Sequence, residues 1–176
     1  DLITEVTFGG DFKTDNVTSM ASMINANANL ATINNINTLN TAKVTSMRGM
    51  FDSDTAITSL DLSAFDTSAL TDMAGMFKNM SGLTSLTLKG SFTVANVTDM
   101  EGTFYGVKNI NTFDLSNLVS KPTNLKQTFA FTGGGAIETI DISNMDLSDV
   151  TTVEWTFFNA NSGLKTIYTA SSVKPE

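Results

Sequence analysis

The sequence contains no cysteine and no histidine among its 176 residues. The lack of cysteine excludes a disulfide framework and thiolate chemistry, and the lack of histidine removes the commonest general base and metal ligand. Only 16% of the residues are charged, no apolar run has the length of a membrane-spanning helix, and no signal peptide or sorting motif is evident. We therefore expect a protein that is not an enzyme and that uses no cofactor and no metal.

Basic residues are also scarce. Ten Lys and Arg stand against eighteen Asp and Glu, for a formal net charge of −8. A nucleic-acid-binding protein needs a basic patch that neutralises phosphates, and an anionic membrane repels an acidic surface. We expect neither nucleic-acid binding nor membrane insertion. Apolar residues make up 41% of the chain, which is enough for a core.

What the chain does contain is an eight-residue pattern of the form VTxMxxMF, which recurs six times. Two clear copies are VTSMRGMF at 44–51 and LTDMAGMF at 70–77. The remaining copies lie at 17–24, 97–104, 122–129 and 150–157. Successive copies begin 27, 26, 27, 25 and 28 residues apart. Self-similarity at a period in the twenties is typical of a solenoid.

Each repeat has two parts. The first has the form LxxLxLxxF, as at 57–65 with isoleucine in the first place, and the pair of apolar residues at spacing two indicates one face of a short strand. The second is the VTxMxxMF part, in which Leu70, Met73 and Phe77 recur at the spacing of an apolar helical stripe. Such a short helix is stable only when it packs on its neighbours.

These patterns predict an α/β fold, a leucine-rich-repeat-type right-handed solenoid of about six repeats of 25–28 residues. Short parallel strands are expected on its concave face and short helices on its convex face. The solenoid is expected to span 1–170, followed by a C-terminal tail or linker at 171–176. Because the chain opens at Asp1 in mid-pattern, we interpret it as a processed or excised fragment.

Two features of the second part call for interpretation. Gly49, Gly75 and Gly102 share one place in three successive repeats, and the simplest reason for a glycine there is close approach of the neighbouring turn. In the last repeat the same place holds Trp155. That tryptophan is expected to form an aromatic lid on the core or a docking surface for a further domain.

The stretch ITSLDLSAFDTSALTDMAGMFKNM at 57–80 resembles the BspA-like leucine-rich repeat, a surface-protein repeat of Gram-positive bacteria, mycoplasmas and some protists. The resemblance extends over nearly the whole chain. It implies a secreted or wall-anchored protein that adheres to host proteins, mucus or other cells. No site residue follows from it, because such repeats form a scaffold and the partner is recognised by variable exposed residues.

The strand pattern indicates which residues face outward. One outward position per repeat lies between two inward ones, and strands in adjacent turns lie about 4.8 Å apart, so the outward side chains are expected to form a continuous polar stripe on the concave face, the usual binding surface of solenoids. The candidate binding residues on or beside this stripe are Asp61, Thr87, Lys89, Asp114, Asp141 and Tyr168.

Asp114 and Asp141 are expected in adjacent turns, with carboxyl groups about 5 Å apart, which is the spacing of a retaining glycosidase. Two carboxylates at this distance also suit a calcium ion when further oxygen ligands are present. The third interpretation is a solvated polar ladder, and we favour it because no cleft or basic substrate clamp accompanies the pair. A regular threonine ladder also suits ice binding, although Asp and Lys side chains interrupt it.

The function expected from these observations is an extracellular binding or adhesion module of a bacterial surface protein. It would recognise a protein or glycan on a host or neighbouring cell through the concave strand face, and further domains of the same polypeptide are expected. The alternative is a structural stalk that displays another domain. A strand face poor in Trp, Tyr and Arg favours the stalk, because binding energy concentrates in those residues.

Overall fold

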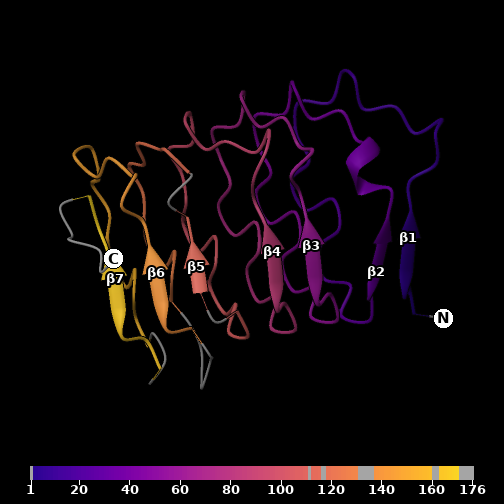
Figure 1. Ribbon diagram of the computed structural model, residues 1–176. Coiled ribbons are helices and arrows are strands. Elements are labelled where there is room, and N and C mark those ends of the chain that lie inside the picture. The colour runs from indigo at the N-terminus through magenta and orange to yellow at the C-terminus, as the bar shows by residue number, and fades with distance from the viewer. Residues whose placement is uncertain (1, 111, 116–117, 131–136, 160–162, 171–176) are drawn as a thin grey trace.

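The structure is a computed structural model that describes residues 2–110, 112–115, 118–130, 137–159 and 163–170, with the backbone alone at 112–114. The expected tail at 171–176 lies outside the described residues. Seven three-residue strands and one 3-10 helix form in the order β1 (Glu5–Thr7), β2 (Thr32–Asn34), η1 (Ile36–Thr38), β3 (Ser59–Asp61), β4 (Ser85–Thr87), β5 (Thr112–Asp114), β6 (Thr139–Asp141) and β7 (Thr166–Tyr168). Figure 1 shows the strands side by side in chain order.

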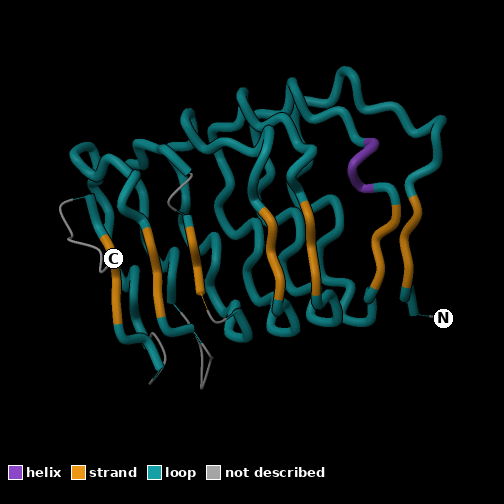
Figure 2. Tube along the Cα trace, viewed as in Figure 1, coloured by secondary structure: helices purple, strands orange, loops and turns teal. Residues whose placement is uncertain are grey.

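The strands pair in parallel, each with a strand of the neighbouring repeat. They form three small sheets, β1-β2, β3-β4 and β5-β6-β7, which Figure 2 shows as short extended pieces joined by long loops and turns. The central residues pair with each other, as Leu60 does with Leu86 and Ile140 with Ile167. Leu60 and Ile140 are buried, and Leu86 and Ile167 pack against the core, so the inward positions predicted from the alternating pattern are confirmed for these strands.

The predicted fold class, an α/β leucine-rich-repeat-type right-handed solenoid, is wrong. Among the described residues the only helix is the single 3-10 turn η1, and the strands form separate two- and three-stranded sheets rather than one continuous sheet. The six VTxMxxMF stretches, here called the turn segments, consist of consecutive turns and isolated bridges. The chain is nearly all sheet, turn and loop.

The hydrogen bonds explain why the turn segments are not helices. In the segment at 44–51, the N–H of Gly49 donates to the carbonyl of Ala74 in the next repeat (2.9 Å), whereas the N–H of Met50 donates to Met47 three residues back (3.1 Å). This alternation recurs in the turn segments at 17–24, 70–77, 97–104 and 122–129. An α-helix needs each N–H for the carbonyl four residues earlier, so giving every second N–H to a neighbouring repeat prevents it.

The turn segments also form a row of parallel bridges on their own side of the molecule. One residue per repeat bridges to its counterpart in the next: Ser19, Ser46, Asp72, Asp99, Asn124 and Thr152. Each repeat is therefore joined to the next twice, through a strand or loop on one side and through a turn segment on the other.

A left-handed backbone conformation favours the glycines of the turn segments. Three other residues, Ser22, Gln127 and Trp155, adopt the same conformation at this place in their own segments. Gly75 has φ +63°, and a Cβ placed on it would lie 3.8 Å from Lys78 and 4.0 Å from Gly49, which are ordinary contacts. The expectation of close approach is therefore wrong at this place. Close approach occurs instead at Gly82, where a Cβ would collide with the carbonyl of Thr55.

We expect Gly75→Ala to destabilise the protein by about 1–2 kcal/mol, the cost of a left-handed conformation for an L-residue. Gly75→Asn should cost less, because asparagine tolerates this conformation. Urea unfolding followed by circular dichroism measures both. Equal stability of the alanine variant and the wild type would contradict the conformational explanation.

A row of phenylalanine rings runs through the core. Phe51, Phe77, Phe104 and Phe129 are fully buried. The ring of Phe77 stacks on that of Phe51 at 6.0 Å and on that of Phe104 at 5.6 Å between centroids. The row continues to Phe157, whose ring lies 5.6 Å from that of Phe129. This confirms the predicted column, and the aromatic side chains act as core.

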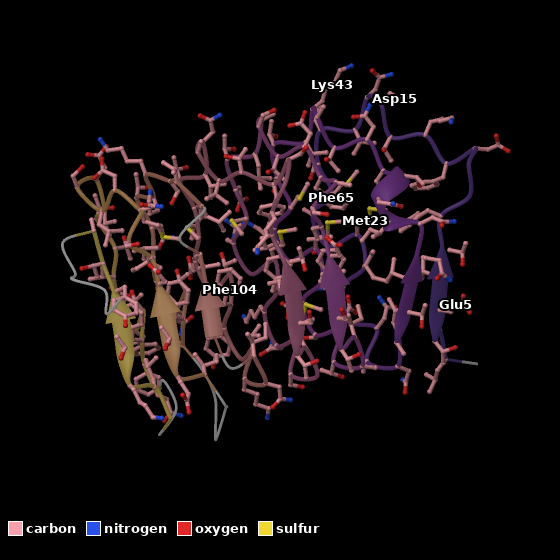
Figure 3. The ribbon with its side chains drawn as sticks, viewed as in Figure 1. Glu5, Asp15, Met23, Lys43, Phe65 and Phe104 are labelled. Carbon is pink, nitrogen blue, oxygen red and sulfur yellow. The ribbon has the colours of Figure 1, made fainter. Side chains whose placement is uncertain are left out.

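The two ends of the core differ from its middle. Phe12 at one end and Val153 at the other are 51% and 63% exposed, whereas the residues at equivalent places in the inner repeats are buried. Figure 3 shows Asp15 and Lys43 projecting from the edge of the molecule and Phe65 within it. Within the described residues, the first and last repeats pack on one neighbouring repeat only, which accounts for the exposure of these two side chains.

Candidate functional site

The predicted site lies on the strand face, defined here as the first and third residues of each strand. Backbone pairing aligns these residues between neighbouring repeats, so that Ser59 lies opposite Ser85 and Asp61 opposite Thr87. In the three-stranded sheet, Asp141 lies between Asp114 and Tyr168. The predicted polar rows are therefore confirmed within each sheet. Across the described strands they are interrupted between β2 and β3 and between β4 and β5, where no sheet joins them.

Two carboxylates of this face, Asp61 and Asp141, bond to their own turns. The backbone N–H of Ser63 donates to Asp61 Oδ1 at 2.9 Å, and that of Ser143 donates to Asp141 Oδ1 at 3.0 Å. The Ser63 N–H holds the pKa of the exposed Asp61 carboxyl below its ordinary value. Asp at this place therefore closes the turn after the strand, which explains its recurrence without a ligand.

The six predicted binding residues fall into two groups. Asp61, Thr87 and the exposed Lys89, which follows β4 by two residues, belong to the region of β3 and β4. Asp114, Asp141 and Tyr168 belong to β5, β6 and β7. No sheet joins β4 to β5 among the described strands, so the six residues do not form one compact site.

The proposed chemistry of Asp114 and Asp141 stays a prediction. Their Cα positions are paired, but the side chain of Asp114 lies outside what the structure describes. In the described part of the chain, no group of three or more acidic residues is placed to hold a metal ion. None of the described helical structure has the length and apolar character needed to cross a membrane.

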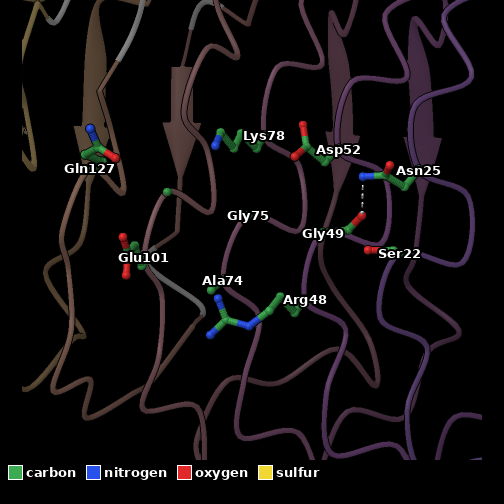
Figure 4. A pocket seen from close by; sticks show the side chains of 11 residues that line it. Ser22, Asn25, Arg48, Gly49, Asp52, Ala74, Gly75, Lys78, Glu101 and Gln127 are labelled. Carbon is green, nitrogen blue, oxygen red and sulfur yellow. Dashed lines mark hydrogen bonds between the residues drawn. The ribbon is translucent and has the colours of Figure 1, made fainter.

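A second surface was not predicted from the sequence. A groove of about 250 Å³ runs along the turn segments over the glycines at 49, 75 and 102 (Figure 4). Its walls are mainly polar: Ser22, Asn25, Arg48, Asp52, Lys78, Glu101 and Gln127. The glycine that recurs between polar residues was the sequence signal for this groove. The signal was not recognised because the segments were interpreted as helices, in which these polar residues would point in different directions.

Two of the four charged residues that line this groove, Arg48 and Glu101, form ion pairs within the protein. Arg48 donates to Asp72 at 3.0 Å and also bonds to Asp99. Lys126 Nζ lies 3.8 Å from Glu101 and 3.7 Å from Glu154. These partly exposed ion pairs each contribute little to stability. They link successive repeats, and they leave the groove without a concentration of charge of one sign.

A family model described as "Mycoplasma protein of unknown function, DUF285" matches residues 4–117 and 87–173. The chain belongs to this family. The two matches overlap at 87–117, as expected when a model that spans several repeats is placed twice on one repetitive chain. No curated protein and no solved structure matches the chain.

This DUF285 chain also contains a buried carboxylate away from both surfaces. Asp54 is fully buried, and its Oδ1 accepts a hydrogen bond of 2.7 Å from the backbone N–H of Asn27. Its Oδ2 has no hydrogen-bond partner among the residues that the structure describes. Burial raises the pKa of Asp54 to about 6, and the nearby Asp52 adds to the increase. The sequence did carry a signal for this burial: Asp54 shares its place in the repeat with Met80 and Val107, and both of these apolar residues are fully buried.

Proposed function

We propose that this protein is an extracellular binding and adhesion module of a bacterial surface protein, secreted or anchored to the cell wall. Its partner is a protein or glycan on a host or neighbouring cell. Membership of the DUF285 family and the resemblance of 57–80 to the BspA-like repeat support this proposal. The proposal also includes further domains in the same polypeptide.

The observation that carries the proposal is the aligned strand face. Exposed Ser59 and Ser85 lie opposite each other, and Thr139 lies opposite Thr166 in the other sheet. Short polar side chains at strand spacing present hydroxyl groups in rows to an extended partner, and surfaces of this kind in stacked-repeat proteins bind macromolecules. Tyr168 at the end of the face adds an aromatic ring beside Asp141.

A stalk that displays another domain is the second candidate. Of the strand-face residues, Tyr168 is the only aromatic one, and Trp and Arg are missing from the set. Since binding energy concentrates in Trp, Tyr and Arg, and Asp61 already bonds to its own turn, the middle of the face has few groups that would dominate an interface.

We expect the double variant Ser59→Lys, Ser85→Lys to weaken binding of the labelled protein to cultured epithelial cells by about tenfold, equivalent to about 1.4 kcal/mol. Two long charged side chains would cover the strand face without entering the core. Flow cytometry measures the binding, and enzymatic removal of surface glycans or proteins from the cells distinguishes the two partner classes.

The matched control is Thr71→Lys, Thr98→Lys, which places the same charges on exposed residues of two adjacent turn segments. This control should bind like the wild type. Equal loss in both double variants would show a general charge effect, and wild-type binding by both would exclude the strand face. No binding by any form would favour the stalk.

The acidic residues of the strand face allow a second test, which asks whether the partner is basic. Asp114→Asn with Asp141→Asn removes two like charges while keeping the side-chain shape. If the partner is basic, we expect slower association and a weaker dependence of binding on salt. Unchanged binding and unchanged salt dependence would show that these carboxylates do not contact the partner.

A further inference from the structure

The groove over the turn segments lies in the middle of the row of repeats. Its floor is formed by Gly49, Gly75 and Gly102, at the same place in three successive turn segments. Each of these segments is bridged to a turn segment on both sides, so the groove does not arise from either end of the chain. Neighbouring segments paired in this way lie about 4.8 Å apart, and the three glycines therefore span about 10 Å. Ser22 and Gln127 occupy the same place in the two flanking segments and stand at the ends of the groove.

The backbone of the groove floor has its hydrogen bonds within the protein. The N–H groups of the three glycines donate to carbonyls of the next repeat at 2.8 to 2.9 Å, and their carbonyls accept from N–H groups three residues later at 3.0 to 3.1 Å. A peptide that binds by strand addition needs unpaired backbone groups on its receptor. This floor does not provide them, so an occupant of the groove is recognised by side chains.

Side chains line the groove on both sides of the glycines. Figure 4 shows Asn25, Asp52 and Lys78 along one side and Arg48 and Glu101 along the other. Two of these side chains are basic and two are acidic, so the groove has no net charge although the whole chain carries −8. A charged polymer would gain little attraction from such a surface. The lining therefore favours an uncharged, polar ligand.

Several polar groups of the lining are free to bond to a ligand. The Ser22 hydroxyl, the Lys78 ammonium and the Gln127 amide form no hydrogen bond or ion pair with any residue that the structure describes. Lys78 Nζ lies over the ring of Tyr105, 5.5 Å from its centroid. Tyr105 borders the floor, because its Cβ lies 3.8 Å from the place that a Cβ would take on Gly102. Its ring offers an apolar face and a polar tip.

The size and repeat of the groove indicate the shape of the ligand. Its volume of about 250 Å³ is below the range of about 300–1,000 Å³ that is typical of pockets enclosing a small molecule. A ligand would therefore lie lengthwise along the groove and extend beyond it. The sugar rings of an extended, β-linked glycan follow one another at a distance similar to one repeat step. Their hydroxyl groups suit amide, carboxylate and ammonium partners.

We propose that this groove binds a linear, uncharged, β-linked glycan that lies along the row of turn segments. Successive sugar rings lie over successive glycines of the floor. Sugar hydroxyls bond to the side chains of Ser22, Lys78 and Gln127, and one ring packs beside Tyr105. The groove is a second binding site on a different side of the molecule from the strand face, and it does not depend on ligand binding by that face.

The probes are cellotetraose and chitotetraose, two extended, uncharged β-linked tetrasaccharides. They are titrated into the whole isotope-labelled protein and followed by NMR. We expect saturable shifts of the amide signals of Gly49, Gly75 and Gly102 with at least one of the two, and no shifts at Ser59 and Ser85 of the strand face. Maltotetraose, which is α-linked and curved, should bind at least about tenfold more weakly.

Gly75→Gln is the variant that fills the groove, and it should weaken tetrasaccharide binding at least about tenfold. The fold accepts glutamine at this place, because Gln127 has φ +56° in its own segment. Gly10→Gln is the matched control, since Gly10 is exposed and a Cβ there would have no atom within 4 Å. Lys78→Met is a second variant, which removes the ammonium and should weaken binding several-fold. Thermal melts check the folding of each variant.

Several results would overturn the proposal. No response to either β-linked tetrasaccharide would do so, as would equal binding of maltotetraose or wild-type binding by both Gly75→Gln and Lys78→Met. The strand-face variant Ser59→Lys, Ser85→Lys should bind the tetrasaccharides like the wild type, and loss of binding there would place the glycan on the strand face instead. Shifts of the groove glycines with carboxymethylated casein, but with neither tetrasaccharide, would assign the groove to an extended polypeptide.

Discussion

Phe77→Ala is expected to lower the free energy of unfolding by about 3–5 kcal/mol. The Phe77 side chain is fully buried, and its ring lies between those of Phe51 and Phe104 at 6.0 and 5.6 Å. Alanine would leave a cavity between two repeats. The surrounding backbone is held on both sides, because Phe77 donates its N–H to Thr103 and Phe51 donates to Met76. The cavity therefore has little freedom to collapse.

Urea unfolding followed by circular dichroism and by Trp155 fluorescence measures this loss. Two probes are needed because stacked repeats are coupled mainly to their neighbours, and a weakened middle repeat can separate the unfolding of the two halves. Phe158→Ala is the control: its ring is 60% exposed, and the expected loss is below about 1 kcal/mol. A loss below about 1 kcal/mol for Phe77→Ala as well would contradict the stacked core.

The protein is expected to become less stable as the pH rises from about 4.5 to 7.5, and Asp54→Asn should remove this dependence. The pKa of Asp54 is raised from 3.8 to about 6 in the folded protein. Below the lower value the carboxyl is protonated in both the folded and unfolded states. Between the two values, unfolding releases the proton, so stability falls as the pH rises. The full difference is about 3 kcal/mol, of which about 2 kcal/mol falls within this pH interval.

The interval is favourable for measurement because the chain has no histidine or cysteine. Lowered pKa values are found for Asp61, Asp66 and Asp146. Their ionised carboxylates stabilise the folded state, and this stabilisation is lost as the pH falls below the interval, which is the opposite trend to that of Asp54. Asparagine keeps an acceptor for the Asn27 N–H. Thermal melts of the wild type and Asp54→Asn across the interval provide the test. A parallel pH dependence in wild type and Asp54→Asn would exclude Asp54 as its origin.

Local alternation in the sequence correctly predicted the inward positions. The pair of apolar residues at spacing two places Leu60 opposite Leu86, and the polar residues Asp61 and Thr87 follow on the other face. This prediction succeeds because side chains of a strand alternate between faces regardless of what the strand packs against. The phenylalanine column was equally predictable, since residues at one place in successive repeats meet when the repeats lie side by side.

The turn segments show where local pattern fails. Apolar residues at 70, 73, 76 and 77 have helical spacing, but consecutive tight turns bring the same residues to one side. The choice depends on where the backbone N–H groups donate. In this protein Gly75 donates to Glu101 of the next repeat at 2.8 Å, and its left-handed φ of +63° is incompatible with a helix. Neither the acceptor nor the φ value is visible in a single repeat.

The sequence by itself determined the number and spacing of the repeats, the residues that face the core and the lack of cysteine and histidine chemistry. The tertiary structure decided that the VTxMxxMF stretches are turns and that Asp54 is buried. The physical reason is that periodicity records which side a residue takes, whereas hydrogen-bond acceptors and desolvation depend on the neighbouring repeat.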